Sequence, residues 1–251
     1  MKLDSIKTFS IAFVLLFTFT SCVKEIHYQN GGKKIKGNKE ITIENREISA
    51  DFNKIKKSGF TNLILEEGKQ NGKIELEGES NLLEYIETKV KGSTLYIGTK
   101  KNISIKAHQN IVLKLPVENL IALASAGSGD ISTTGKLHAK KFSINQAGSS
   151  DLNLDLETDL LKINMAGSGD IKLSGKSKNL EVSKTGSGDL FAFNFLVENA
   201  KINSTGSGDA EIYVEDKLSI SKTGSGDIFY KGNVEDVKTS STGSGKVVEK
   251  N

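Results

Sequence analysis

The sequence has very few of the residues that usually fix a backbone by covalent or steric means. It contains one cysteine, Cys22, and one proline, Pro116, and it has no tryptophan. A single cysteine excludes an intrachain disulfide, so packing and hydrogen bonds must hold the fold together. Glycine is abundant, with 25 residues. Abundant glycine, together with many serines, threonines and asparagines, favours short strands joined by tight turns over helices.

Arginine is also scarce, because Arg46 is the only one and lysine supplies the rest of the positive charge. The formal net charge is +3, and the lysines are spread among acidic residues. Nucleic-acid-binding proteins usually concentrate basic residues on one face and use arginine to read bases. We therefore expect no nucleic-acid partner. The proportions of hydrophobic residues, 36%, and charged residues, 26%, are those of a chain that buries a core.

The N-terminal region has the features of an export signal. The apolar run Ile11–Phe19 is too short to cross a bilayer as a helix, which takes about 20 residues, but it suits a signal-peptide core. Cys22 follows Phe19-Thr20-Ser21, and this tetrapeptide resembles a bacterial lipobox in which Phe19 replaces the usual leucine. We expect residues 1–21 to be a signal peptide and Cys22 to carry a lipid. The protein would then be an outer-membrane lipoprotein, on either the periplasmic or the surface face.

The remaining chain is expected to form a tether and one continuous domain. Residues 22–40 show little apolar periodicity and are interpreted as a tether that lifts the domain off the membrane. Residues 41–120 contain strand-like segments with loose spacing, interpreted as irregular first coils and a cap. Within them, Asn81–Thr88 is expected to form a short helix or a wide loop. Residues 121–251 are expected to form regular coils.

A Gly-Ser-Gly-Asp motif recurs through this last region. Five copies are complete, and the two degenerate ones read AGSSD and TGSGK. Successive copies are 21, 19, 19, 20, 18 and 19 residues apart. A constant period indicates stacked structural repeats rather than a flexible linker. The first glycines of the seven copies are Gly127, Gly148, Gly167, Gly186, Gly206, Gly224 and Gly243.

Between two motifs the hydrophobic residues alternate with polar ones. After Asp170, Ile171 and Leu173 alternate in this way, and later Leu180 and Val182 do so again. Period-two alternation predicts strands with one buried and one solvated face, so each repeat is expected to hold at least two short strands and two corners. Stacking equivalent strands satisfies the backbone and builds a continuous core. The predicted fold is therefore an all-β, single-chain parallel β-helix with about 19 residues per coil, wound right-handed as parallel crossovers almost always are.

In such a fold the motif would form a corner of each coil. Glycine tolerates positive φ and lets stacked backbones approach closely, and an aspartate that closes a turn can accept hydrogen bonds from the turn's own N–H groups. Six aspartates would stack as a column whose neighbours repel by roughly 1 kcal/mol in water. Turn N–H groups, lysines such as Lys184 and Lys222, or bound Ca²⁺ could offset this repulsion. We favour the structural role without a cofactor and keep Ca²⁺ binding as the alternative. The six residues are Asp130, Asp151, Asp170, Asp189, Asp209 and Asp227.

Several stretches ahead of the motifs resemble the head GIN domain family, which is known as an auto-transporter adhesin head of Bacteroidetes-type envelopes. The resemblance extends from about Ile43 to Val247. It implies an exported, often lipidated β-helical protein and brings no catalytic residues. The stretches are Phe52–Ile55, Gly59–Leu65, Ile74–Thr88, Leu95–Gly98, the strand end at Pro116, and the Gly-Ser-Gly-Asp series.

Catalytic motifs are poorly matched. No Gly-Ser-Gly is followed by the Lys-Ser/Thr of a phosphate-binding loop, and Ser149 and Ser150 lack the strand–turn–helix context of a nucleophilic serine. The histidines His27, His108 and His138 do not cluster in the sequence, which argues against a metal site. The acidic segment from Asp155 to Asp159 is interpreted as a solvated loop.

Three classes of function remain. The leading one is an adhesin or binding module for a glycan or a protein, since a long regular face suits an extended partner. The second is a structural envelope protein that associates with copies of itself. The third is a polysaccharide lyase or hydrolase, which would need paired carboxylates or a calcium ion on one face.

Overall fold

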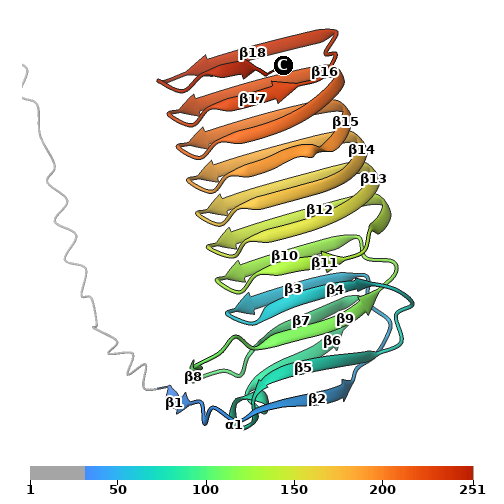
Figure 1. Cartoon of the computed structure of the whole chain (residues 1–251), viewed down its shortest axis with the longest axis vertical. Coiled ribbons are helices and arrows are strands. Elements are labelled where there is room, and N and C mark those ends of the chain that lie inside the picture. Colours follow the sequence, from blue (N-terminus) through green and yellow to red (C-terminus); the bar gives the residue numbers. More distant parts are fainter. Residues whose placement is uncertain (1–31, 251) are drawn as a thin grey trace, which may run out of the picture. The chain divides into compact units, whose positions relative to one another are not determined.

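The protein, described by a computed structural model for residues 32–250, is built almost entirely of strands. Figure 1 shows them stacked as successive coils. The elements are β1 (Lys33–Lys36), β2 (Ile41–Glu47), β3 (Lys54–Gly59), β4 (Asn62–Glu67), β5 (Lys73–Glu79), α1 (Ser80–Leu83), β6 (Ile86–Lys91), β7 (Thr94–Thr99), β8 (Ile103–Lys106), β9 (Val112–Val117), β10 (Ala122–Gly127), β11 (Ile131–Thr134), β12 (Leu137–Gly148), β13 (Leu152–Gly167), β14 (Ile171–Gly186), β15 (Leu190–Gly206), β16 (Ala210–Gly224), β17 (Ile228–Lys231), β18 (Asp236–Thr242) and β19 (Val247–Glu249).

The predicted β-solenoid is confirmed by the strand pairing. From β10 to β19 every pairing is parallel, and each strand pairs with the equivalent strand of the next coil. The motif glycines fall in register, since Gly127 pairs with Gly148, Gly148 with Gly167, and Gly167 with Gly186. The period of about 19 residues in the sequence is therefore the circumference of one coil.

Each regular coil contains fewer strands than the alternation predicts. The two expected short strands merge into one long bent strand of 15 to 17 residues in β13, β14, β15 and β16. The second corner is a bend within the strand rather than a break. Buried hydroxyls stabilise this bend locally: the Thr158 hydroxyl donates to the Leu160 carbonyl at 3.2 Å, and the Ser177 hydroxyl donates to the Asn179 carbonyl at 2.8 Å. Only the Gly-Ser-Gly-Asp corner interrupts the strand.

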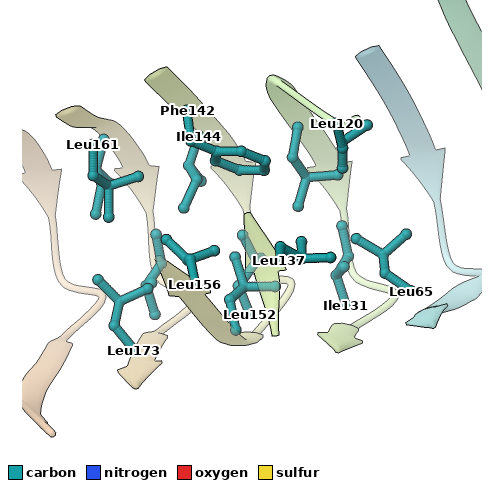
Figure 2. Close-up of a cluster of buried hydrophobic side chains, with 14 of the residues drawn as sticks. Leu65, Leu120, Ile131, Leu137, Phe142, Ile144, Leu152, Leu156, Leu161 and Leu173 are labelled. Carbon is teal, nitrogen blue, oxygen red and sulfur yellow. The ribbon is translucent and has the colours of Figure 1, made fainter. Parts of the chain in front are cut away.

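The core is a set of aliphatic columns enclosed by the coils. Figure 2 shows side chains of successive coils meeting inside the solenoid, among them Ile131, Leu152 and Leu173. Ile131 pairs with Leu152 and Leu152 with Ile171, and all three are buried. Full burial of a leucine or isoleucine side chain stabilises the fold by roughly 1.5–3 kcal/mol. Because the same columns continue through every coil, no coil has a core of its own.

The N-terminal coils are irregular, as predicted, and they close one end of the solenoid with antiparallel strands. β2 pairs antiparallel with β5, β5 with β9, and β6 with β7. The predicted helical piece is α1, only four residues long. β3 and β4 form a full coil that lies between β7/β9 on one side and β10/β11 on the other. The chain thus forms one coil with β3 and β4, then forms the irregular strands from β5 to β9, and continues the stack of coils at β10, which pairs with β3.

The fold begins earlier than the predicted boundary at residue 41, so the prediction of a tether up to residue 40 is wrong for its last part. β1 pairs in parallel with β8, and the turn after β1 is held by the buried carboxylate of Glu79. This carboxylate accepts hydrogen bonds from the Lys39 N–H at 2.6 Å and from the His108 N–H at 2.8 Å, and it contacts the His108 ring. A Cβ at Gly37 would overlap the same carboxylate.

The corner glycines answer two different steric demands. The first glycine of each motif has positive φ, for example +117° at Gly186. The second glycine does not, because Gly188 and its equivalents lie outside the positive-φ region. Gly188 is required instead by close approach, because a Cβ there would lie 2.2 Å from the carbonyl oxygen of Gly169 in the coil below.

We predict that Gly186→Ala destabilises the protein more than Gly92→Ala. Gly92 has a φ of +55° and open space around its missing Cβ, so alanine there costs only the conformational strain of about 1 kcal/mol. At Gly186 the added Cβ would also lie 2.3 Å from the carbonyl oxygen of Gly167. We expect a total loss of about 2–4 kcal/mol, measured by urea denaturation. Equal losses in the two variants would contradict the close-approach explanation.

Candidate functional site

The six motif aspartates form the column that the sequence predicts, and their carboxylates accept hydrogen bonds. The Oδ1 atom of each aspartate accepts a hydrogen bond from the backbone N–H of the equivalent residue in the next coil. For example, Asp170 accepts from the Asp189 N–H at 2.7 Å, and Asp189 accepts from the Asp209 N–H at 2.7 Å. The expected acceptance from the turn's own N–H groups is therefore wrong, because the donor belongs to the following turn. The column is a ladder that joins the coils.

The ladder continues beyond the six aspartates at both ends. At one end Asp227 accepts from the Lys246 N–H at 2.7 Å. At the other end the Asp130 N–H donates to the Oδ1 atom of Asn62 at 3.0 Å. Asn62 closes an eighth corner, Gly59–Asn62, in which Gly59 has a φ of +85°. This corner does not stand out in the sequence, because its residues read GFTN and Gly59 lies 68 residues before Gly127.

The glycine carbonyls provide a second set of contacts between coils. The carbonyl oxygen of Gly148 accepts from the N–H groups of Ser168 at 2.9 Å and Gly169 at 3.1 Å, and equivalent pairs recur in the coils above. The motif serines thus contribute their backbone N–H groups to the contacts between coils. A serine-to-serine hydroxyl bond along the stack joins Ser244 to Ser225 at 3.2 Å.

Inside the corner lies a column of buried polar side chains. It contains three lysines, Lys57, Lys184 and Lys222, each with 2–3% of its surface exposed. The Lys57 ammonium donates to the Gly129 carbonyl, and the Lys222 ammonium donates to the Gly224 carbonyl at 3.1 Å. Lys184 Nζ is buried without a hydrogen-bond partner among the residues that the structure describes. The other polar members of the column are Ser125, Gln146 and Ser204, and the apolar Met165 lies in the same column between Gln146 and Lys184.

These lysines face the aspartate ladder across the corner backbone. Burial lowers the pKa of Lys57 from its ordinary value of 10.5 to about 8, and the negative charge of Asp130 opposes this shift. Burial likewise lowers the pKa of Lys184, opposed by Asp189, Asp209 and Asp170. Ammonium groups inside the corner therefore offset part of the repulsion in the ladder outside it. The sequence suggested this role for Lys184 and Lys222, and the ladder charges act on Lys184 and on Lys57.

Within residues 32–250, no three histidine, cysteine, aspartate or glutamate side chains come close enough to hold a metal ion. His108 contacts Glu79, and His138 lies on the opposite side of the coil from the Gly-Ser-Gly-Asp corner, beside the strand bends. Cys22 and His27 lie outside the described residues, so the lipid-attachment prediction has no structural counterpart here.

The acidic segment from Asp155 to Asp159 is part of β13, not the loop predicted from the sequence. It lines an open groove of about 640 Å³ at the strand bends. Glu157 pairs with Lys176 at 3.0 Å, and Asp159 pairs with Lys178 at 2.8 Å. Hydrogen bonds from these lysines lower the pKa of both carboxyl groups. A general acid in a glycosidase needs a raised pKa, so this pair is poorly suited to that role.

We predict that Asp189→Asn has little effect on stability, whereas Asp189→Ala costs about 1–3 kcal/mol. Asparagine keeps an Oδ1 acceptor for the Asp209 N–H, as Asn62 does naturally for Asp130. Alanine leaves that N–H unpaired. Thermal melts with chelator and with millimolar Ca²⁺ should agree for the wild type. A large rise of the melting temperature with Ca²⁺, absent in Asp189→Asn, would contradict the structural role.

We also predict that the buried Lys57 makes stability rise with pH above about 8. Its pKa is about 8 in the folded state and near 10.5 when unfolded. The unfolded state therefore binds more protons between these values, and the free energy of unfolding increases across this window. Lys57→Met should reduce the increase, as followed by urea denaturation from pH 7 to 10.5. The exposed neighbour gives the control variant Lys56→Met, which should keep the wild-type slope. An unchanged slope in Lys57→Met would refute the prediction.

Comparison with known proteins agrees with this architecture. The family described as "Putative auto-transporter adhesin, head GIN domain" matches residues 51–234. No match is found among curated proteins. No helix within residues 32–250 has the length and apolarity to span a membrane.

Solved structures from Bacteroides and Parabacteroides species share the fold. A putative adhesin from Bacteroides fragilis has 22% identity and a TM-score of 0.80, covering 86% of this chain and all of that one. A putative adhesin from Parabacteroides distasonis has 25% identity and a TM-score of 0.70, with coverage of 87% and 100%. A protein from the same organism described as a putative lipid binding protein has 26% identity and a TM-score of 0.72, with the same coverage. With its stacked Gly-Ser-Gly-Asp corners and antiparallel cap, the chain belongs to the head GIN domain family.

Proposed function

We propose that the protein is an adhesin of the cell envelope, held at the outer membrane by a lipid on Cys22, whose solenoid binds an extended glycan or protein. The observation that carries this proposal is that the outward columns of side chains are the part of the solenoid left free for a partner. The interior is filled by aliphatic side chains. At the corner, the ladder carboxylates and glycine carbonyls already accept hydrogen bonds.

The outward columns are regular enough to match a repeating partner. Parallel pairing holds equivalent residues about 4.8 Å apart from coil to coil, so an extended chain along the solenoid axis meets a similar environment at each step. On the flat strand before the corner, one such column contains Asn145, Asn164, Ser183 and Asn203. Side-chain amides and hydroxyls both donate and accept hydrogen bonds, as a glycan or a peptide backbone requires. Two structural relatives described as putative adhesins support the same reading.

Self-association is the second candidate. Among the strands of residues 32–250, the edge strand β2 pairs only with β5, and its Ile41 and Ile43 are 42% and 54% exposed. An exposed apolar edge strand is a template for pairing with another chain. Polysaccharide cleavage is the third candidate, and the lysine-paired Glu157 and Asp159 argue against it at the groove where the acidic side chains gather. Ca²⁺ at the aspartate ladder is not part of the proposal.

The proposal is tested by applying bacteria with a two-membrane envelope, expressing the full chain, to glycan and protein arrays. We expect cells with the wild-type chain to be retained on a subset of spots. Cells with Cys22→Ser should not be retained, because the head is released or its signal peptide remains uncut. The purified chain from residue 22, with Cys22→Ser, should bind the same spots. Binding to no spot, together with turnover of an acidic polysaccharide or with self-association alone, would contradict the adhesin proposal.

A further inference from the structure

The last coils have a cluster of aromatic side chains on their outward face, and nothing described above uses it. Phe191, Phe193, Tyr213 and Phe229 project from strands that follow the Gly-Ser-Gly-Asp corner, together with lysines and Glu211. We call this surface the aromatic patch. One of its columns is continuous from coil to coil and consists of Lys172, Phe191, Glu211, Phe229 and Val248.

The patch coincides with the clearest irregularity of the regular coils. The interval from Gly186 to Gly206 is 20 residues, and the pairing of β15 with β16 jumps from Ala192 to Leu196. Phe193, Asn194 and Phe195 therefore have no partner on β16. Such bulges re-aim side chains and are frequent beside functional sites. Phe195 is buried in the core, whereas Phe193 and Asn194 face outward and line a pocket.

This pocket has a volume of about 380 Å³ and is lined by Lys172, Phe191, Phe193, Asn194 and Glu211. The volume is at the lower end of the range for small-molecule sites. It combines two aromatic rings with a cation, an amide and a carboxylate. The rings supply apolar faces, and the polar groups can fix the orientation of a ligand.

Lysines lie over several of the rings. Lys231 Nζ is 4.8 Å from the centre of the Phe193 ring and 5.4 Å from that of Tyr213, and Lys250 Nζ is 4.5 Å from that of Phe229. Cation–π attraction holds each ammonium against the surface. Phe191 is 38% exposed, and no lysine of residues 32–250 makes a cation–π contact with its ring. One ring face is thus open and is flanked by positive charge.

We infer that the aromatic patch binds an anionic glycan, with a sugar ring against Phe191 and its acidic groups near Lys172 and Lys231. Lys172 lines the pocket beside Phe191, and Lys231 lies over the neighbouring Phe193 ring, so both ammonium groups can pair with carboxylate or sulfate groups of the ligand. The coil spacing of about 4.8 Å is close to the length of one pyranose unit, so neighbouring sugars can meet neighbouring coils.

The position of the patch fits a binding head. It lies on the last coils of the solenoid, whereas β1, where the described chain begins, lies at the opposite end (Figure 1). The inference rests on the proposed adhesin function, since it specifies the surface and the ligand class of that same head.

The experiment uses the unlipidated mature chain, residues 22–251 with Cys22→Ser, and an α-1,4-linked tetragalacturonate in calorimetric titration. Its methyl ester is the matched neutral probe, with the same rings and linkage. We expect the acid to bind at least tenfold more tightly than the ester. Phe191→Ser should weaken both at least tenfold, because it removes the ring face. Lys231→Gln should weaken only the acid.

Two control variants place the same changes elsewhere. Tyr96→Ser removes a ring that is 41% exposed on the N-terminal coils, and Lys238→Gln removes an exposed lysine on the opposite flat strand. Both should bind the acid as the wild type does, and unchanged thermal melts show that all variants fold. Failure of the wild type to prefer the acid, or unchanged binding in Phe191→Ser, overturns the inference. Binding of the wild type to phosphatidylglycerol vesicles, without binding to the tetragalacturonate, would also overturn the inference. If the inference is overturned but cells with Phe191→Ser are still retained on the array spots of the wild type, the adhesin proposal stands and only the aromatic patch is excluded as its binding surface.

Discussion

The close approach of glycine backbones at one corner of each coil is the constraint on which the rest of the structure depends. Gly186 and its equivalents adopt positive φ, and a Cβ at Gly188 would lie 2.2 Å from the carbonyl oxygen of Gly169 in the preceding coil. This contact lets the glycine carbonyl accept two N–H groups from the following coil. It also sets the coil spacing, which fixes the register of the long strands and of the aliphatic columns inside them. The Gly-Ser-Gly-Asp motif has a constant period in the sequence because this close approach of glycine backbones recurs once in each coil.

The charges at the corner follow from the same geometry. Stacked corners bring aspartates into a column, and each carboxylate accepts a hydrogen bond from a backbone N–H of the next coil. Buried ammonium groups at Lys57, Lys184 and Lys222 lie on the inner side of the column. The carboxylates and glycine carbonyls of the corner are thereby used in contacts between coils, and the outward strand faces remain for recognition. The aromatic patch on β15, β16 and β17 is the place where such a face departs most from small polar side chains.

The sequence predicted the coils well because alternation and glycine spacing are local and repeated. It also contained a signal for the buried lysines, since Lys184 continues the inward alternation of Leu180 and Val182. The corner at Gly59–Asn62 could not be found in this way, because its neighbour in the stack is 68 residues away and its residues differ. β1 was missed because it is a short, lysine-rich strand held by a distant partner, β8. The aromatic patch could not be predicted in this way, because alternation shows which residues of a strand face outward but not which outward face binds a partner.

Amide hydrogen exchange at the corners tests the central claim most directly, because the Asp209 N–H is protected only if the Asp189 carboxylate of the preceding coil accepts it. Asp209 is only half-buried, so burial alone cannot slow its exchange. We predict that the N–H groups of Asp170, Asp189 and Asp209 exchange as slowly as those of the flanking strands. Exchange at the rate of an unprotected surface amide, with the strands still protected, would contradict the ladder and the account built on it.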